Sequence, residues 1–206
     1  MNEVILCGAG GHVKVVLSLL QHLGYDVPYI LDDAPDRAGL SINGVPIRGP
    51  LSLLPDSPDT FAFLAISDNQ QRELASQRFK NVNWVTLVHP VSFVAASAKM
   101  GAGNYIAAGA VVNAKAVLGD HVIVNTGASV GHDCIVEEFV QLESGVRLGG
   151  GAHLEQGALC QIGSSVVPNC LIGARATLGP RAVAVKPVPA GETYDGVPAR
   201  PRLEQP

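Results

Sequence analysis

The chain places an apolar residue at every sixth position across residues 94–184, and this period limits what the segment can fold into. The repeat has no break, and its anchors are Val94, Met100, Ile106, Val112, Leu118, Val124, Val130, Val136, Leu142, Leu148, Leu154, Cys160, Val166, Ile172, Leu178 and Ala184. A period of six matches neither an α-helix, which repeats about every 3.6 residues, nor a strand that alternates every second residue. It is typical of a parallel β-helix, in which each hexad forms one short strand and one corner. Because three hexads close one coil, the anchors predict about five coils of about eighteen residues, stacked about 4.8 Å apart.

Small residues accompany the anchors. Four residues after many of them lies a small or β-branched residue that fits a tight corner, as at Ala110, Ala116, Val122, Ala128, Cys134, Val140, Ala152, Ala158, Ser164, Cys170 and Ala176. Three of the four cysteines, Cys134, Cys160 and Cys170, fall on inward positions of the repeat, and Cys7 lies in an apolar strand. Since no CxxC pair is present, the spacing favours buried small hydrophobes over a disulfide or a zinc site.

Charge and hydropathy exclude several classes of protein. The 206 residues include 14 Lys and Arg against 18 Asp and Glu, and the net charge of −4 leaves no basic surface for nucleic acid. No stretch reaches the length of an apolar membrane span, and the first residues lack the basic start of a signal peptide. The composition therefore predicts a cytoplasmic protein with no membrane span and no nucleic-acid partner.

The front of the chain has a different pattern. A short apolar strand over residues 3–7 is followed by the glycine turn Gly8–His12 and by an apolar helix over 13–23. A second strand over 27–31 ends in Asp32 and Asp33. Strand, glycine turn and helix open a Rossmann-like unit, and the acidic pair lies where such a fold holds a ribose. The third glycine of a dinucleotide fingerprint would fall at Val13, and a half-unit is too small for NAD.

The remaining elements complete a small domain. We expect a hairpin over 42–48, a strand over 61–66, a helix over 69–79 and a strand over 84–88, which together form a parallel sheet of about four strands. Its carboxyl edge collects the polar groups of the domain, namely the glycine turn with Gly10, Gly11 and His12, the pair Asp32 and Asp33, the turn Ser67, Asp68 and Asn69, and His89. Each of these groups, taken alone, could have a purely structural role, such as that of a helix cap. Their convergence on one edge predicts a ligand site with a phosphate on the glycine-turn N–H groups. The predicted boundaries are 1–89 for this domain and 90–206 for the β-helix.

Histidines are the natural bases of the repeat region near neutral pH. His121, His132 and His153 are separated by 11 and 21 residues, so no two of them stack one coil apart, and we expect no metal site. His132, followed by Asp133, differs from the others because Gly150 lies one coil later. A base beside a backbone N–H suits acyl transfer, in which the N–H stabilises a tetrahedral oxyanion. The alternative interpretation is that His132 is an ordinary surface histidine at a coil corner.

The chain resembles the hexapeptide-repeat acyltransferases that use acetyl-CoA, and specifically the PglD, NeuD and perosamine acetyltransferase group. The resemblance covers nearly the whole chain and is carried by Gly8–Lys14, Asp32–Asp33, His89–Pro90, Asn125–Cys134 and Gly196–Arg200. It implies a left-handed β-helix behind the Rossmann-like domain, and a homotrimer that binds acetyl-CoA in the groove between neighbouring β-helices.

The resemblance also implies roles for individual residues. His132 matches the catalytic base, with Asp133 beside it, and Gly150 matches the glycine whose amide faces the acetyl carbonyl. Ile162 and Pro180 match positions that contact the coenzyme. The nucleotide-linked sugar is expected on the N-terminal domain, near the residues of the carboxyl edge given above.

Three positions depart from the pattern of the group. Many relatives carry glutamate where this chain has Asp133, and some carry a second histidine where it has Gln141, which cannot carry a proton at neutral pH. Pro180 has no N–H, so only its carbonyl could contact the coenzyme.

The resemblance predicts an acetyltransferase that acts on the 4-amino group of a nucleotide-linked deoxysugar for a surface glycan. O-acetylation of a sugar such as sialic acid by the same residues, and a non-catalytic trimer, stay open at this point, as does the identity of the nucleotide.

Overall fold

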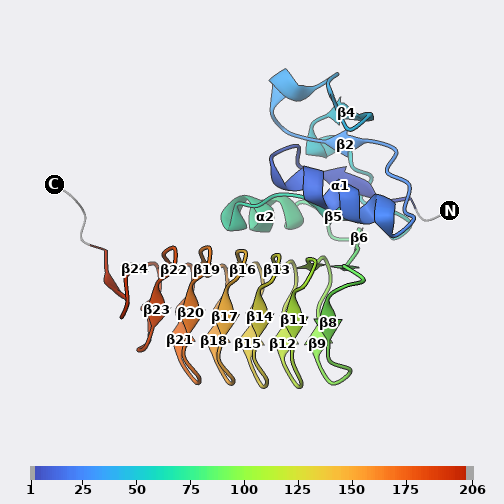
Figure 1. Ribbon diagram of the computed structural model, residues 1–206. Coiled ribbons are helices and arrows are strands. Elements are labelled where there is room, and N and C mark those ends of the chain that lie inside the picture. The colour runs from blue at the N-terminus through green and yellow to red at the C-terminus, as the bar shows by residue number, and fades with distance from the viewer. Residues whose placement is uncertain (1–2, 203–206) are drawn as a thin grey trace. The chain divides into compact units, whose positions relative to one another are not determined.

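The structure is a computed structural model that describes residues 3–202, and it divides after Leu87 into two compact units (Figure 1). We call residues up to Leu87 the α/β unit and the residues from Val88 onward the β-helix. No helix in the described part of the chain has both the length and the apolar character needed to cross a membrane.

The α/β unit is built on a six-stranded sheet in the order β3-β4-β2-β1-β5-β6. The strands are β1 (Ile5–Cys7), β2 (Ile30–Leu31), β3 (Ser41–Ile42), β4 (Val45–Gly49), β5 (Phe61–Leu64) and β6 (Asn83–Trp84). All neighbours pair in parallel except β3 and β4. The helices are α1 (His12–His22) and α2 (Asn69–Ser76), and two short 3-10 turns cover Pro35–Arg37 and Leu51–Leu53.

Two details of this sheet correct the prediction from sequence. The expected four strands are six, because both strands of the hairpin join the sheet through a tight turn at Asn43 and Gly44, which have φ of 50° and 83°. The predicted strand over 84–88 is two strands. Its first part lies in β6, whereas β7 (Leu87–Val88) belongs to the eight-stranded sheet of the β-helix.

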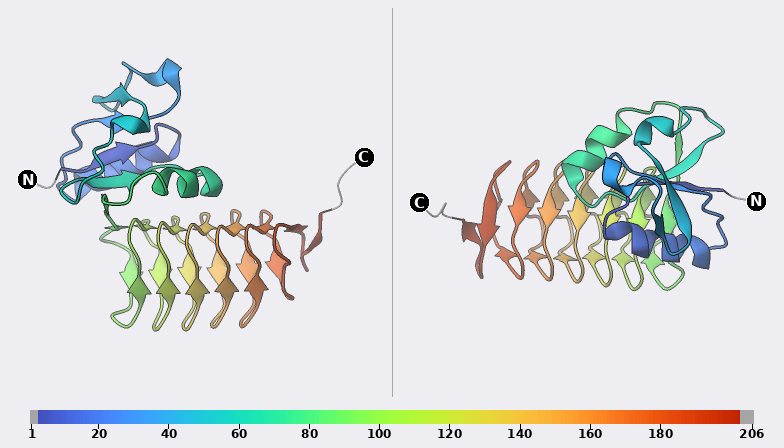
Figure 2. Two further views of the ribbon diagram at one scale, coloured as in Figure 1. Left: turned by 180° about the vertical axis from the view of Figure 1, so that it is seen from behind. Right: turned by 90° about the horizontal axis from the view of Figure 1, so that it is seen from above.

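The β-helix confirms the hexad pattern. Its two-residue strands are β8 (Phe93–Val94), β9 (Lys99–Met100), β10 (Tyr105–Ile106), β11 (Val111–Val112), β12 (Val117–Leu118), β13 (Ile123–Val124), β14 (Ser129–Val130), β15 (Ile135–Val136), β16 (Gln141–Leu142), β17 (Arg147–Leu148), β18 (His153–Leu154), β19 (Leu159–Cys160), β20 (Ser165–Val166), β21 (Leu171–Ile172), β22 (Thr177–Leu178) and β23 (Val183–Ala184). Every predicted anchor is the second residue of one of these strands. The coils stack in chain order (Figure 2).

The strands form three sheets of eight, six and five strands, one for each side of the coil. Registers such as Val112 on Val130 and Val136 on Leu154 join residues one coil apart. The anchors and the small corner residues fill the interior, including Cys134, Cys160 and Cys170. These cysteines and Cys7 are free and buried, and burial raises the pKa of Cys7 and Cys160 to about 12, as expected for thiols that serve as packing groups.

The last coil departs from the hexad rule. After β23 the chain forms β24 (Thr193–Asp195), which extends the eight-stranded sheet in parallel, and β25 (Arg200–Pro201), which pairs with β24 antiparallel. An antiparallel strand cannot continue the coil, so it ends the repeat.

Candidate functional site

His132 and Asp133 form the corner between β14 and β15, where the six-stranded sheet passes into the five-stranded sheet. His132 Nδ1 lies 2.7 Å from Asp133 Oδ2, and the side chains are 71% and 57% exposed. Because the carboxylate can only accept, a neutral His132 ring carries its proton on Nδ1 and presents the lone pair of Nε2. Asp133 has a φ of 57°, so its side chain is placed beside the ring by a left-handed corner.

Gly150 lies directly against the reactive edge of this imidazole. A Cβ atom placed on Gly150 would be 2.5 Å from His132 Nε2 and 2.6 Å from Cε1. The neighbouring N–H groups are used between coils, since Gly149 donates to Val166 O and Gly151 donates to His132 O, each at 2.8 Å. The N–H of Gly150 donates none of the backbone hydrogen bonds found within residues 3–202. The predicted stacking of Gly150 on His132 is therefore present.

Ile162 and Pro180 lie at a different corner of the same β-helix. They are one coil apart, between the eight-stranded and the six-stranded sheets, and Ile162 is 55% exposed. Ile162 N donates to Glu143 Oε2 at 2.8 Å, and its carbonyl accepts from Arg181 N at 2.9 Å. Within one chain, the structure does not bring this corner to the corner of His132. Gln141 lies elsewhere again, buried in β16 of the eight-stranded sheet.

The three β-helix histidines are separate, as their spacing predicts. His121 is buried and stacks on Phe139 with ring centroids 5.3 Å apart. His153 Nε2 lies 2.8 Å from Glu137 Oε1. Within the described residues, no group of three or more His, Cys, Asp or Glu side chains could hold a metal ion.

At the carboxyl edge of the α/β sheet, Asp32 braces the glycine turn. Its Oδ2 accepts from Ala9 N at 2.5 Å and from Arg37 Nη1 at 3.0 Å, while Oδ1 accepts from Ala34 N at 2.9 Å. Gly10 and Gly11 follow in this turn, and a Cβ on either would meet no atom within 4 Å. The turn therefore leaves open space at the start of α1, where a phosphate could lie.

Asp33 holds a second group at this edge. Its Oδ1 accepts from Leu51 N at 2.7 Å, and its Oδ2 lies 2.6 Å from Arg78 Nη1. The pair borders a pocket of about 220 Å³, whose lining is Asp32, Asp33, Leu51, Ile66, Gln71, Leu74, Ala75 and Arg78. Arg78 was not among the site residues predicted from the sequence, although a basic residue at the end of a helix that follows a sheet strand was a usable signal.

A buried arginine shapes the third turn of this edge. Arg72 is 1% exposed, and its Nη1 donates to Ile66 O at 2.9 Å and to Ser67 O at 3.2 Å. Its Nη2 donates to Asn69 Oδ1 at 2.8 Å, while Asp68 caps α2 by accepting from Gln71 N at 2.8 Å. Burial lowers the pKa of Arg72 to about 10, so the guanidinium stays charged at neutral pH. Ser67, Asp68 and Asn69 are thus held in a fixed turn by a residue that the sequence analysis missed.

His12 is the first residue of α1 and is half-buried, with its Nε2 atom shielded from solvent. Burial lowers its pKa to about 4, and the charge of Arg72 acts in the same direction. The unfolded chain takes up a proton at His12 near pH 6.5, whereas the folded chain does so only near pH 4. The contribution of neutral His12 to the free energy of unfolding should therefore be fully present above pH 7. It should be lost as the pH falls from 6.5 to 4, which lowers the free energy of unfolding by about 3 kcal/mol.

The His12 variant tests this origin of the pH dependence. Urea unfolding of His12→Gln should show a flatter dependence between pH 7 and 4 than the unsubstituted chain. His22→Gln, at the other end of α1, should keep the full dependence. An equal slope in His12→Gln and the unsubstituted chain would show that His12 is not buried as a neutral ring.

Replacing Asp32 tests whether its carboxylate braces the glycine turn. Asp32→Ala leaves the Ala9 N–H without its acceptor and should lower the free energy of unfolding by about 1–3 kcal/mol. Denaturant unfolding measures the change, and Asp36→Ala, an exposed neighbour in the Pro35–Arg37 turn, should leave stability within about 0.5 kcal/mol. Unchanged stability in Asp32→Ala would contradict the bracing role.

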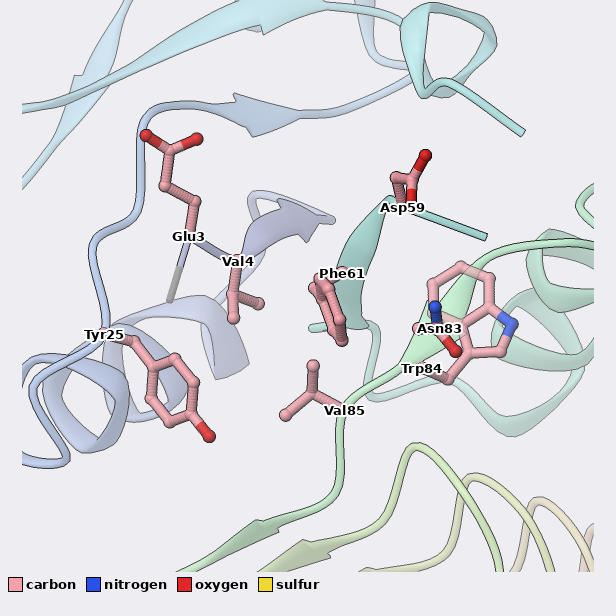
Figure 3. Close-up of a pocket in the computed structure, with 8 residues that line it drawn as sticks. All are labelled: Glu3, Val4, Tyr25, Asp59, Phe61, Asn83, Trp84 and Val85. Atoms are coloured by element: carbon pink, nitrogen blue, oxygen red, sulfur yellow. The ribbon is translucent and has the colours of Figure 1, made fainter. Parts of the chain in front are cut away.

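A larger pocket lies at the opposite edge of the sheet, at the amino ends of β1, β5 and β6. It measures about 570 Å³ and is lined by Glu3, Val4, Tyr25, Asp59, Phe61, Asn83, Trp84 and Val85 (Figure 3). Phe61 is half exposed at this edge. The expected ligand edge is the other one, and the sequence analysis did not anticipate this pocket. The exposed aromatic residue that opens β5 was the available signal.

The comparisons with known proteins agree with this architecture. The model of the PglD N-terminal domain family matches residues 3–79. Perosamine N-acetyltransferase from Caulobacter crescentus, solved as a histidine-to-asparagine mutant with CoA and GDP-perosamine, is 32% identical with a TM-score of 0.92, over 99% of this chain and 98% of that one. The acetyltransferase domain of PglB from Neisseria gonorrhoeae, in complex with acetyl coenzyme A, is 36% identical with a TM-score of 0.87, over 98% and 100% of the two chains.

Two further matches extend the comparison. WeeI from Acinetobacter baumannii is 25% identical with a TM-score of 0.87, over 98% of this chain and all of that one. An uncharacterized protein of Acanthamoeba polyphaga mimivirus is 32% identical over 103 residues, and the chain spans about a fifth (21%) of the length of that curated relative. The near-complete overlap with the solved enzymes shows that the chain belongs to the PglD and perosamine N-acetyltransferase group of acyltransferases.

Proposed function

We propose that the chain transfers the acetyl group of acetyl-CoA to the 4-amino group of a nucleotide-linked amino-deoxysugar, a step in building a surface glycan, with His132 as general base. The observation that carries the proposal is the close approach of His132 Nε2 to Gly150, whose N–H donates no backbone hydrogen bond within residues 3–202. The Caulobacter enzyme, similar over nearly its whole length, is a perosamine N-acetyltransferase seen with CoA and GDP-perosamine. Similarity to that enzyme supports an amine as the acceptor.

The reaction needs no covalent intermediate on the protein. The amine nitrogen attacks the thioester carbonyl and forms the C–N bond, and the carbonyl electrons move to oxygen, which the Gly150 N–H stabilises. His132 Nε2 takes a proton from the nitrogen of the tetrahedral intermediate. The oxyanion then collapses, the C–S bond breaks, and His132 passes the proton to the departing thiolate of CoA. Asp133 holds the ring in place through its contact with Nδ1.

The nucleotide sugar is proposed to bind at the carboxyl edge of the α/β sheet. The diphosphate would lie on the turn of Gly10, Gly11 and His12, where the space at the two glycines is open and where Asp32 fixes the shape of the turn. Asp33 and the turn Ser67–Asn69 border the same edge and would contact the nucleoside. UDP, GDP and dTDP all carry the diphosphate that this turn would hold.

The acyl donor is proposed to lie between two copies of the chain in a homotrimer. His132 is exposed at one corner, whereas Ile162 and Pro180, the expected coenzyme contacts, lie at another corner of the same coil stack. A neighbouring copy that presents its Ile162 corner to the His132 corner would complete the site. Sedimentation should give a mass three times the 21.4 kDa of the chain. A monomer that remains fully active would contradict this arrangement.

Turnover on a defined panel tests the proposed function. Purified protein with acetyl-CoA should release free CoA thiol in the presence of one UDP-, GDP- or dTDP-linked 4-amino-6-deoxysugar. The cytoplasm, which supplies both substrates, is the proposed location. Release only with sialic acid or CMP-sialic acid would instead establish O-acetylation. No release with any acceptor, although the protein is folded, would favour a non-catalytic trimer.

A further inference from the structure

Gly149, Gly150 and Gly151 pack so closely against the neighbouring coils that a side chain at any of them would collide. A Cβ on Gly149 would lie 2.5 Å from Pro168 N. A Cβ on Gly150 would collide with His132 of the preceding coil, and a Cβ on Gly151 would overlap the Oδ1 of Asn169 of the following coil. His132 of the preceding coil therefore lies against Gly150, and Asn169 of the following coil lies against the adjacent Gly151.

Asn169 is held in place by its backbone. It lies one coil after Gly151 and two coils after Asp133, at the same corner, and its N–H donates to Gly150 O at 3.0 Å. Its φ of 57° is a left-handed corner conformation that asparagine tolerates. The side chain is exposed, and within residues 3–202 it takes part in no hydrogen bond that would occupy its amide. The side-chain amide of Asn169 is thus positioned beside Gly151 and is available to a ligand.

We propose that Asn169 is a donor-positioning residue, whose side-chain amide hydrogen-bonds the pantetheine arm of acetyl-CoA next to the thioester. The inference rests on the proposed function, because it takes the thioester carbonyl to lie at Gly150 N–H. In this arrangement the acceptor amine approaches on the His132 side of Gly150, and the pantetheine arm runs along the Asn169 side. The first amide of that arm is separated from the sulfur by two methylene groups, a span close to the coil spacing of about 4.8 Å. An asparagine amide, with both a donor and an acceptor, matches such an amide group.

The variant Asn169→Gly isolates the side chain. Glycine adopts a positive φ without strain, as it does at Gly151, so the backbone corner is kept while the amide is removed. Arg175→Gly is the matched control, because Arg175 has a φ of 55° at the corner between the five-stranded and eight-stranded sheets. Both variants should be compared by calorimetric titration with CoA and by steady-state kinetics.

Loss of one hydrogen bond should raise the Kd for CoA and the KM for acetyl-CoA of Asn169→Gly by about three- to tenfold. The KM for the nucleotide sugar and the thermal midpoint should stay near those of the unsubstituted chain, and Arg175→Gly should show no change in the Kd. Unchanged CoA affinity in Asn169→Gly, with active unsubstituted protein, would overturn this inference alone. If the unsubstituted chain binds no CoA, the proposed function and the inference both fail.

Discussion

His132→Ala should lower kcat by about 10²–10⁴-fold, the usual contribution of a positioned general base. The side chain is mostly exposed and pairs with the side chain of Asp133, so its removal should leave the coil intact. Steady-state release of CoA thiol measures the loss, and circular dichroism and the thermal midpoint check the fold.

His153→Ala is the matched control for this variant. His153 is also a histidine of the β-helix paired with a carboxylate, but it lies in β18 and its partner, Glu137, is not a residue of the proposed site. It should keep full turnover. If His132→Ala retains the kcat of the unsubstituted chain, His132 is not the base.

Gly150→Ala should be nearly as damaging, for a steric reason. The new methyl group would lie 2.5 Å from His132 Nε2, so the ring must move away from the position where it meets the amine. A displacement of about 1 Å at a reacting group costs about 10²-fold in rate. Gly150 does not have a positive φ, so alanine adds no backbone strain there. The measurement is kcat with saturating acetyl-CoA.

The double variant His132→Ala/Gly150→Ala separates the collision from other effects of the methyl group. Crowding by one methyl group typically lowers the free energy of unfolding by about 1–3 kcal/mol. That loss should shrink when the imidazole is removed, because the methyl group then has room. An equal loss in both backgrounds would show that His132 does not lie against Gly150.

The repeat made the β-helix and the central contact of the site predictable. Because each hexad supplies one strand and one corner, the sequence number of a residue determines its coil and its side of the triangle. The stacking of Gly150 on His132 follows from a separation of one coil, and the paired strands have that register. The same rule shows that Ile162 and Pro180 stack on each other and lie away from His132.

The α/β unit was less predictable, because its contacts join residues that are distant in sequence. The pair of Asp33 and Arg78 spans 45 positions, so a local pattern could single out Arg78 but could not predict its partner. Arg72 is polar in a helical segment, which usually indicates an exposed face, yet it is buried under the Ser67–Asn69 turn. The break of the expected 84–88 strand has the same origin, since β6 and β7 pair with strands of different units.

The most direct test of the proposed N-acetyltransferase function is to identify the bond formed when acetyl-CoA and a nucleotide-linked 4-amino-6-deoxysugar are incubated with the protein. Isolation of the product and two-dimensional NMR would locate the acetyl group. We predict an amide at the C4 nitrogen, formed by the unsubstituted chain and not by His132→Ala. An ester on a sugar hydroxyl, or an amide formed equally by both proteins, would contradict it.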